Sequence, residues 1–154
     1  MEDLKNALEI TKINRKALAK ILNHYTLEKL NEIPEGFNNN LFWNIAHVVV
    51  TQQLLVYGLS GLEKNIPEEW IELYKKGTST KHDATENELI QLKGFLFSTI
   101  EQTEKDIDAN IFKEYSNYMT STGFELQSIS HAFNFNNFHE GIHLGYILAL
   151  KKAL

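Results

Sequence analysis

Apolar residues recur near the 3.6-residue period of an α-helix in four long stretches of the chain. The first stretch covers residues 3 to 31 and is followed by Pro34 and Gly36, which should end it. The second runs from Asn40 to about Leu59 and is apolar almost all round. Such a pattern indicates a helix buried against several neighbours.

The third stretch runs from about Glu86 to Asp108 and opens with a capping box formed by Thr85 and Glu88. The fourth runs from about Glu125 to Lys152, and its closing lysines suit the negative end of a helix dipole. No strand pattern, repeat or low-complexity tract interrupts these stretches. The sequence therefore predicts an all-α fold, a four-helix bundle.

The connection between the second and third stretches, roughly 25 residues, is longer than bundle loops usually are. Part of it should be a short helix built on Trp70, Ile71 and Tyr74, with Pro67 at its first position and Gly77 just past its end. A long, partly helical crossover can link helices that are not antiparallel neighbours. Residues 111 to 123 are expected to form an ordered loop over one end of the bundle.

Composition narrows the class of protein. A chain of 154 residues is the size of one domain, so we expect a single bundle over 1–154. The net charge of −5 and the presence of one arginine, Arg15, argue against a nucleic-acid partner. The chain shows neither a signal peptide nor an apolar run long enough for a membrane, which makes a cytoplasmic location the expectation. Cysteine is absent, so any metal must be held by His, Asp or Glu.

Three of the six histidines are candidates for a metal site. His139 and His143 are four residues apart, so they project from one face of a helix and can offer two imidazoles to one cation. His47 lies alone in the apolar second stretch, where a buried ring needs a partner. Asn44 and Thr51 share its helix face and could satisfy it without a metal, or could orient it toward one.

The string HEGIH, which contains Glu140, matches the H-E-x-x-H motif of zinc metalloproteases. In that class the third ligand normally lies downstream, but no His, Asp or Glu follows His143. A third ligand must therefore come from upstream. His131 lies on the same helix stripe as His139 and is either a fourth ligand or a residue at the helix start. His24 and His82 have hydrophilic surroundings and should be solvated.

The segment PEGFNNNLFWNIAHVVVTQQLLVYGLSG, followed by HEGIHLGYI near the end of a chain of about 150 residues, resembles the DinB superfamily of metalloenzyme-like bundles. The resemblance covers essentially the whole chain. It implies a four-helix bundle with metal ligands at His47, His139 and His143. The family motif often continues H-x-G-Q, whereas this chain has Tyr146 after Gly145.

The resemblance also implies a function with two alternatives. One is a metal-dependent enzyme, a hydrolase or a transferase that uses a low-molecular-weight thiol, acting on a small molecule. The other is a non-catalytic bundle that a metal staples together, a dimeric binding or stress-related module. All-imidazole ligation suits a divalent transition metal, with zinc or nickel first. Glu140 is the candidate catalytic base, Trp43, Phe138 and Tyr146 are candidate pocket residues, and a homodimer is expected.

Overall fold

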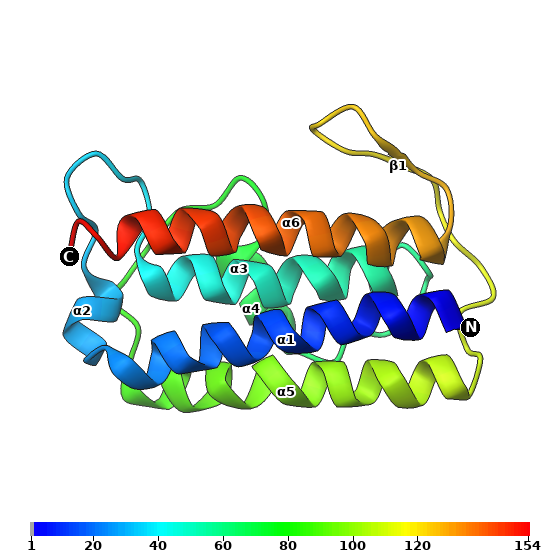
Figure 1. Cartoon of the computed structure of the whole chain (residues 1–154), viewed down its shortest axis with the longest axis horizontal. Helices are drawn as coiled ribbons and strands as arrows, with labels where there is room; N and C mark the ends of the chain where they lie inside the picture. The colour runs from blue at the N-terminus through cyan, green and yellow to red at the C-terminus, as the bar shows by residue number, and fades with distance from the viewer. Residues whose placement is uncertain (1) are drawn as a thin grey trace.

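The computed structural model describes residues 2–154, and nearly all of its regular structure is helical (Figure 1). This confirms the predicted all-α class. The elements are α1 (Glu2–His24), α2 (Leu27–Asn31), α3 (Leu41–Gln53), the π-helical turn η1 (Leu54–Gly58), α4 (Glu68–Tyr74), α5 (Glu86–Asp108), β1 (Tyr118–Met119), β2 (Glu125–Leu126) and α6 (Ile129–Leu150).

The four long helices lie side by side along the length of the molecule (Figure 1). In that view α1 and α6 run in one direction, and α3 and α5 run in the other. Helices α3 and α5 are thus parallel, although they follow one another as long helices in the chain. The long connection that carries α4 makes this order feasible, as the sequence predicted.

The first predicted helix is broken near its end. We expected one helix over residues 3 to 31, but α1 stops at His24 and α2 begins at Leu27. Thr26 adopts an extended conformation (φ −65°, ψ 157°), and its side chain accepts a hydrogen bond from the Lys29 backbone N–H. A threonine that caps a new helix ends the old one, because its own backbone leaves the helical region.

The other helix starts are close to prediction. Asn40 caps α3 by accepting a hydrogen bond from the backbone N–H of Trp43, and Thr85 and Glu88 form the expected capping box of α5. Helix α4 begins at Glu68, so Pro67 precedes its first residue instead of occupying it.

The segment before α6 contains a short hairpin that the sequence analysis missed. Tyr118 pairs with Leu126 and Met119 pairs with Glu125 in an antiparallel register. Gly123, with φ of +84°, permits the turn between them. Helix α6 therefore starts at Ile129, later than the predicted Glu125, and the Ser128 side chain caps it. Two-residue strands are too short to show an alternating pattern in a sequence.

The end of the second predicted helix is wound as a π-helix. The backbone N–H of Leu59 bonds to the carbonyl of Leu54, five residues earlier. Such π-turns are rare inside α-helices and occur frequently at functional sites. Nothing in the residue pattern distinguishes this turn from a continued α-helix.

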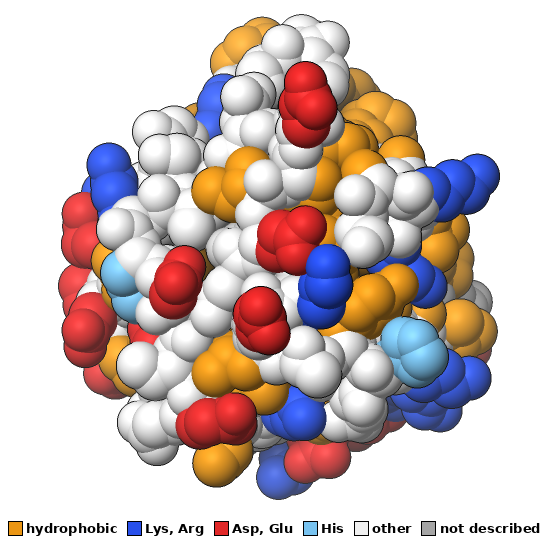
Figure 2. Space-filling model, turned by 90° about the vertical axis from the view of Figure 1, so that its left-hand side faces the viewer, with side chains coloured by type: hydrophobic (Ala, Val, Ile, Leu, Met, Phe, Trp, Pro, Cys, Tyr) orange, Lys and Arg blue, Asp and Glu red, His pale blue; other side chains and the backbone are white. Residues whose placement is uncertain are grey.

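Buried apolar side chains fill the space between the helices, and α3 contributes the most continuous set. At the end of the bundle that carries the C-terminus, acidic and basic side chains are mixed with hydrophobic ones (Figure 2). None of the helices in residues 2–154 combines the length and the apolar character needed to cross a bilayer.

Candidate metal centre

The structure brings His47 of α3 together with His139 and His143 of α6. Their ring centroids are 4.6–5.1 Å apart, and one nitrogen from each ring lies within 4.8 Å of the others. Two nitrogens bound to one zinc ion are at most about 4.2 Å apart, because Zn–N bonds are about 2.0–2.1 Å long. Binding would therefore draw the rings slightly together. The three residues are close enough to share one cation.

Hydrogen bonds at Nδ1 orient two of the rings, which leaves Nε2 as the nitrogen that could bind a metal. The Nδ1 atom of His47 lies 2.6 Å from the carbonyl oxygen of Tyr74, which can only accept, so this nitrogen carries the proton. The Nδ1 atom of His143 lies 3.0 Å from Oδ1 of Asn44. The Asn44 amide is itself oriented by its Nδ2 group, which donates to the Asn40 carbonyl at 2.8 Å. In both rings the lone pair is consequently on Nε2.

The third ring has an unsatisfied nitrogen. The Nδ1 atom of His139 is buried and has no hydrogen-bond partner in the described residues. A buried polar atom without a partner costs about 1–3 kcal/mol, and native proteins rarely leave one unexplained. A cation coordinated by that nitrogen would satisfy it. The donor set, three imidazoles with no thiolate, also fits a divalent transition metal.

Burial keeps all three imidazoles neutral near pH 7. Burial lowers the pKa of His47, a residue that is only 5% exposed. The pKa of His139 is lowered to about 3, mainly by burial and to a smaller extent by the neighbouring His143, His47 and Arg15. Burial and His47 lower the pKa of His143 to about 4. Neutral imidazoles retain the lone pairs that a metal requires.

Two neighbours support His47 from its own helix. Trp43 stacks on the imidazole with a centroid distance of 4.7 Å and an angle of 9° between the planes. The Thr51 hydroxyl lies 3.3 Å from Nε2 of His47 and donates to it, because Nδ1 carries the proton. Thr51 was expected beside this ring, whereas Asn44 contacts His143 instead. Spacing along one helix could not reveal that contact across two helices.

A large cavity of about 600 Å³ opens beside the three histidines. Its walls come from α3 and η1 on one side and α6 on the other, and the β1–β2 hairpin and Lys76 contribute to its rim. Pockets that bind small molecules are typically about 300–1,000 Å³. The cluster is thus accessible to a ligand of small-molecule size.

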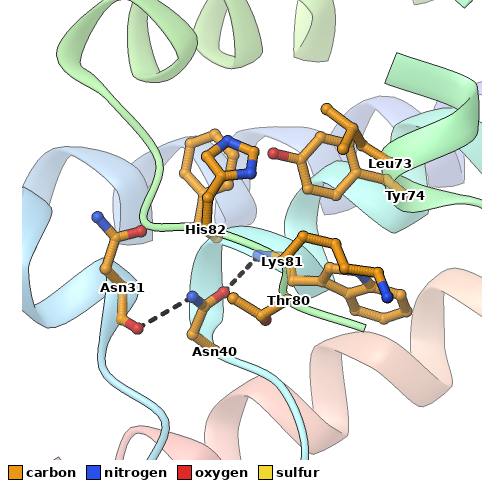
Figure 3. A pocket seen from close by; sticks show the side chains of 9 residues that line it. Asn31, Asn40, Leu73, Tyr74, Thr80, Lys81 and His82 are labelled. Atoms are coloured by element: carbon orange, nitrogen blue, oxygen red, sulfur yellow. Dashed lines mark hydrogen bonds between the residues drawn. The ribbon is translucent and has the colours of Figure 1, made fainter. Parts of the chain in front are cut away.

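Only one of the three predicted pocket residues lines this cavity. Phe138 does, but Tyr146 packs edge-on against Phe37 instead. Trp43 borders a separate crevice near the start of α3, shown in Figure 3. That crevice holds about 10 Å³, enough for about one water molecule and too small for a substrate.

Glu140 is not brought to the histidines. It is 1% exposed, and Arg15 contacts its carboxylate through Nε and Nη2, the closest distance being 2.8 Å. Asn14 and Asn136 donate to the same carboxylate at 2.7 and 3.0 Å. Its position one residue after His139 turns it toward α1, away from the cavity. The predicted role as a catalytic base stays a prediction that this geometry does not favour.

The remaining histidines lie apart from the cluster. His131 is close to the start of α6, where its Nδ1 accepts a hydrogen bond from the Gln127 backbone N–H. It therefore corresponds to the helix-start alternative. His82 is paired with Glu88 at the surface.

The fold and the site define a class: a helical bundle with a candidate three-histidine metal centre between two of its long helices. The family model described as the DinB superfamily matches residues 10–147. The chain belongs to the DinB superfamily, as its sequence resemblance indicated. A search of curated proteins found no match.

Proposed function

We propose that this protein is a metal-dependent enzyme that acts on a small molecule at the three-histidine cluster, as a hydrolase or a thiol-dependent transferase. The observation that supports the proposal is the position of the cluster at the wall of a large cavity. A site that served only as a staple would have no need for such a cavity. A divalent ion there would keep an open coordination position and supply Lewis-acid activation of a water or a thiol.

Neighbouring residues orient the histidine rings before any metal binds. Tyr74 and Asn44 fix the ring orientations of His47 and His143, so little reorganisation is needed on binding. Thr51 lines the cavity next to His47, and its hydroxyl becomes free to bind substrate or solvent once a cation takes Nε2. Much of the cavity lining is apolar, so a substrate that fills the cavity would displace water and strengthen the polar contacts inside it.

The alternative is a bundle stapled by its metal. The cluster does join α3 to α6, as a staple would. One experiment separates the enzyme from the staple. It uses untagged protein loaded with Co²⁺, because the visible spectrum of this ion reports its ligands. We expect one ion per chain and a changed spectrum when a small thiol is added.

Two controls make this test decisive. His139→Ala should abolish stoichiometric binding, and His82→Ala, which alters a histidine outside the cluster, should not. Absence of a bound ion in the unmodified protein would refute the metal site. A bound ion whose spectrum responds to neither thiols nor small anions would establish the staple instead.

We also propose the expected homodimer, with the outer face of α6 as its interface. Helix α6 contains one carboxylate and no lysine or arginine; that carboxylate, Glu140, is buried, and large apolar side chains are exposed on the outer face. Tyr146 and Leu148, which do not line the cavity, are 39% and 48% exposed, and Phe138 and Ile142 extend the apolar surface to the rim of the cavity. Gly141 and Gly145 lie on the same face, and nothing lies within 4 Å of a Cβ placed there, so another helix could approach closely.

A further inference from the structure

The cavity beside the histidines is chemically asymmetric along its length. Helices α3 and α6 run in opposite directions, so residues after His47 and residues before His139 extend toward the same end of the bundle. Those residues are apolar: Leu54, Leu55 and Leu59 on one wall face Phe135 and Phe138 on the other. Eight residues of α-helix, the separation of Phe135 from His143, span about 12 Å. The cavity is therefore an apolar trough with imidazoles at one end.

The charge in the cavity has one sign. Lys76 is the one lysine, arginine or carboxylate side chain among the residues that line it, and within residues 2–154 it forms no ion pair. Lys76 follows two residues after Tyr74, whose carbonyl holds His47. It therefore enters from the side on which His47 lies. Ser121 and Thr122 add two further hydroxyls to the lining, whereas the Thr120 hydroxyl already donates to the Phe124 carbonyl.

From this arrangement we propose that the cavity binds an apolar acid, a small molecule with a hydrocarbon or aromatic body and one carboxylate. The carboxylate lies at the histidine and Lys76 end, and the body lies along the trough between η1 and α6. A chain of about eight to ten carbons suits the length of that trough. The proposal rests on the proposed function in placing a substrate class at the same site, but the trough and Lys76 exist without a metal.

Gly58 is a position at which a substitution can fill the trough without changing a metal ligand. It lines the cavity at the end of η1, and a Cβ added there meets nothing closer than 3.8 Å, the distance to a Leu54 methyl carbon. Its φ is not positive, so a larger side chain causes no backbone strain. Gly58→Phe should therefore fold and occupy the trough. Gly94→Phe, on the exposed surface of α5, is the matched control.

The test measures binding of hexanoate, octanoate and decanoate by calorimetry to the full chain, metal-free and zinc-loaded. Octanol and octylamine serve as neutral and cationic probes of the same length. We expect affinity to rise up to about fourfold per methylene, because burying each CH₂ contributes about 0.8 kcal/mol. Octanoate should bind more tightly than octanol and octylamine, and zinc should strengthen octanoate binding further.

The variants locate the two halves of the ligand. Lys76→Gln should weaken octanoate several-fold and leave octanol unchanged, and Lys76→Glu should favour octylamine over octanoate. Lys20→Gln, on the exposed surface of α1, should change neither. Gly58→Phe should abolish binding of all three C8 probes, whereas Gly94→Phe should not.

The results separate this inference from the proposed function. If octanoate binds but zinc does not, the metal function fails and the apolar-acid cavity stands. If zinc binds but octanoate does not, or binds no better than octylamine, the apolar-acid inference is overturned. Affinity that is independent of chain length, or unaffected by Gly58→Phe, would overturn it as well.

Discussion

At the scale of single residues, the site depends on groups that hold the imidazoles as well as on the imidazoles themselves. The three histidines could be predicted from the sequence, because a polar ring in an apolar helix and a four-residue spacing are visible in one dimension. The assignment of Asn44 to His47 was wrong, because Asn44 bonds to His143 of another helix. Contacts between helices depend on how the helices are placed, which residue spacing does not encode.

Asn44→Leu should weaken metal binding by about 10- to 100-fold, because His143 loses the acceptor that fixes its tautomer. Competition with a chromogenic chelator measures the affinity. Asn136→Leu is the matched control, since it also removes a buried asparagine but one that bonds to Glu140. Equal losses in the two variants would show that general destabilisation, and not the His143 contact, is responsible.

The metal-free protein should lose stability as the pH falls below about 6.5. The unfolded chain binds protons at the ordinary histidine pKa of 6.5, but in the folded protein the pKa is about 3 for His139 and about 4 for His143. Protons therefore favour the unfolded chain from pH 6.5 down to about 4. Each such histidine contributes up to about 1.4 kcal/mol per pH unit.

Urea unfolding of the metal-free protein between pH 7.5 and 5 measures this effect while most carboxylates stay ionised. The exposed His24, replaced by glutamine, should leave the slope unchanged. His143→Gln should reduce it. A free energy of unfolding that does not change over this range would contradict the buried, neutral cluster.

At the scale of elements, helix existence was predictable and several helix ends were not. The capping box of α5 and the Asn40 cap of α3 are local signals that the sequence displays. The break at Thr26 was missed because threonine is compatible with a helix until tertiary packing decides. The hairpin before α6 was missed because two-residue strands are too short to show an alternating pattern. The π-turn η1, which lines the cavity, has no recognisable sequence pattern.

The buried ion pair between Arg15 and Glu140 joins α1 to α6 and should be strongly coupled. Both side chains are 1% exposed, so Glu140→Leu leaves a buried guanidinium uncompensated and should cost about 3–5 kcal/mol. The double variant Arg15→Met, Glu140→Leu should recover part of that loss, because two apolar side chains need no partner. The buried Asn136 amide, which still lacks its acceptor, should keep the recovery incomplete. Denaturant unfolding of the unmodified protein, the two single variants Arg15→Met and Glu140→Leu, and the double variant gives the coupling energy.

Metal affinity in the same variants tests the role once predicted for Glu140. If the glutamate only joins helices, the double variant should bind zinc nearly as well as the unmodified protein. A double variant that is stable but has lost its response to thiols or small anions would instead return Glu140 to the chemistry of the site.

At the scale of the whole molecule, the bundle and its family were predictable because the helical periodicity and the two histidine segments extend over the chain. Most of the lining of the cavity was not. It depends on the antiparallel placement of α3 against α6 and on where the β1–β2 hairpin lies. Only Phe138 of the three expected pocket residues lines it.

The proposed dimer gives a prediction at this scale. Leu148→Lys places a charge on the exposed apolar face of α6, away from the cavity lining, and should shift the protein from dimer to monomer. Light scattering at a fixed protein concentration measures the mass. Ile90→Lys on α5, where the side chain is 67% exposed, should leave the dimer intact. A monomeric unmodified protein would contradict the proposal directly.

The contact between Asn44 and His143 joins residues 99 positions apart in the chain. Contacts of such long range form late in folding, since the intervening chain must first be ordered. The nascent chain therefore cannot assemble the three imidazoles until α6 has been synthesised and has docked on α3. Ion uptake would follow that docking step and, by mass action, slow its reversal. In this protein cofactor loading would thus secure α6, which leaves the ribosome well after α3.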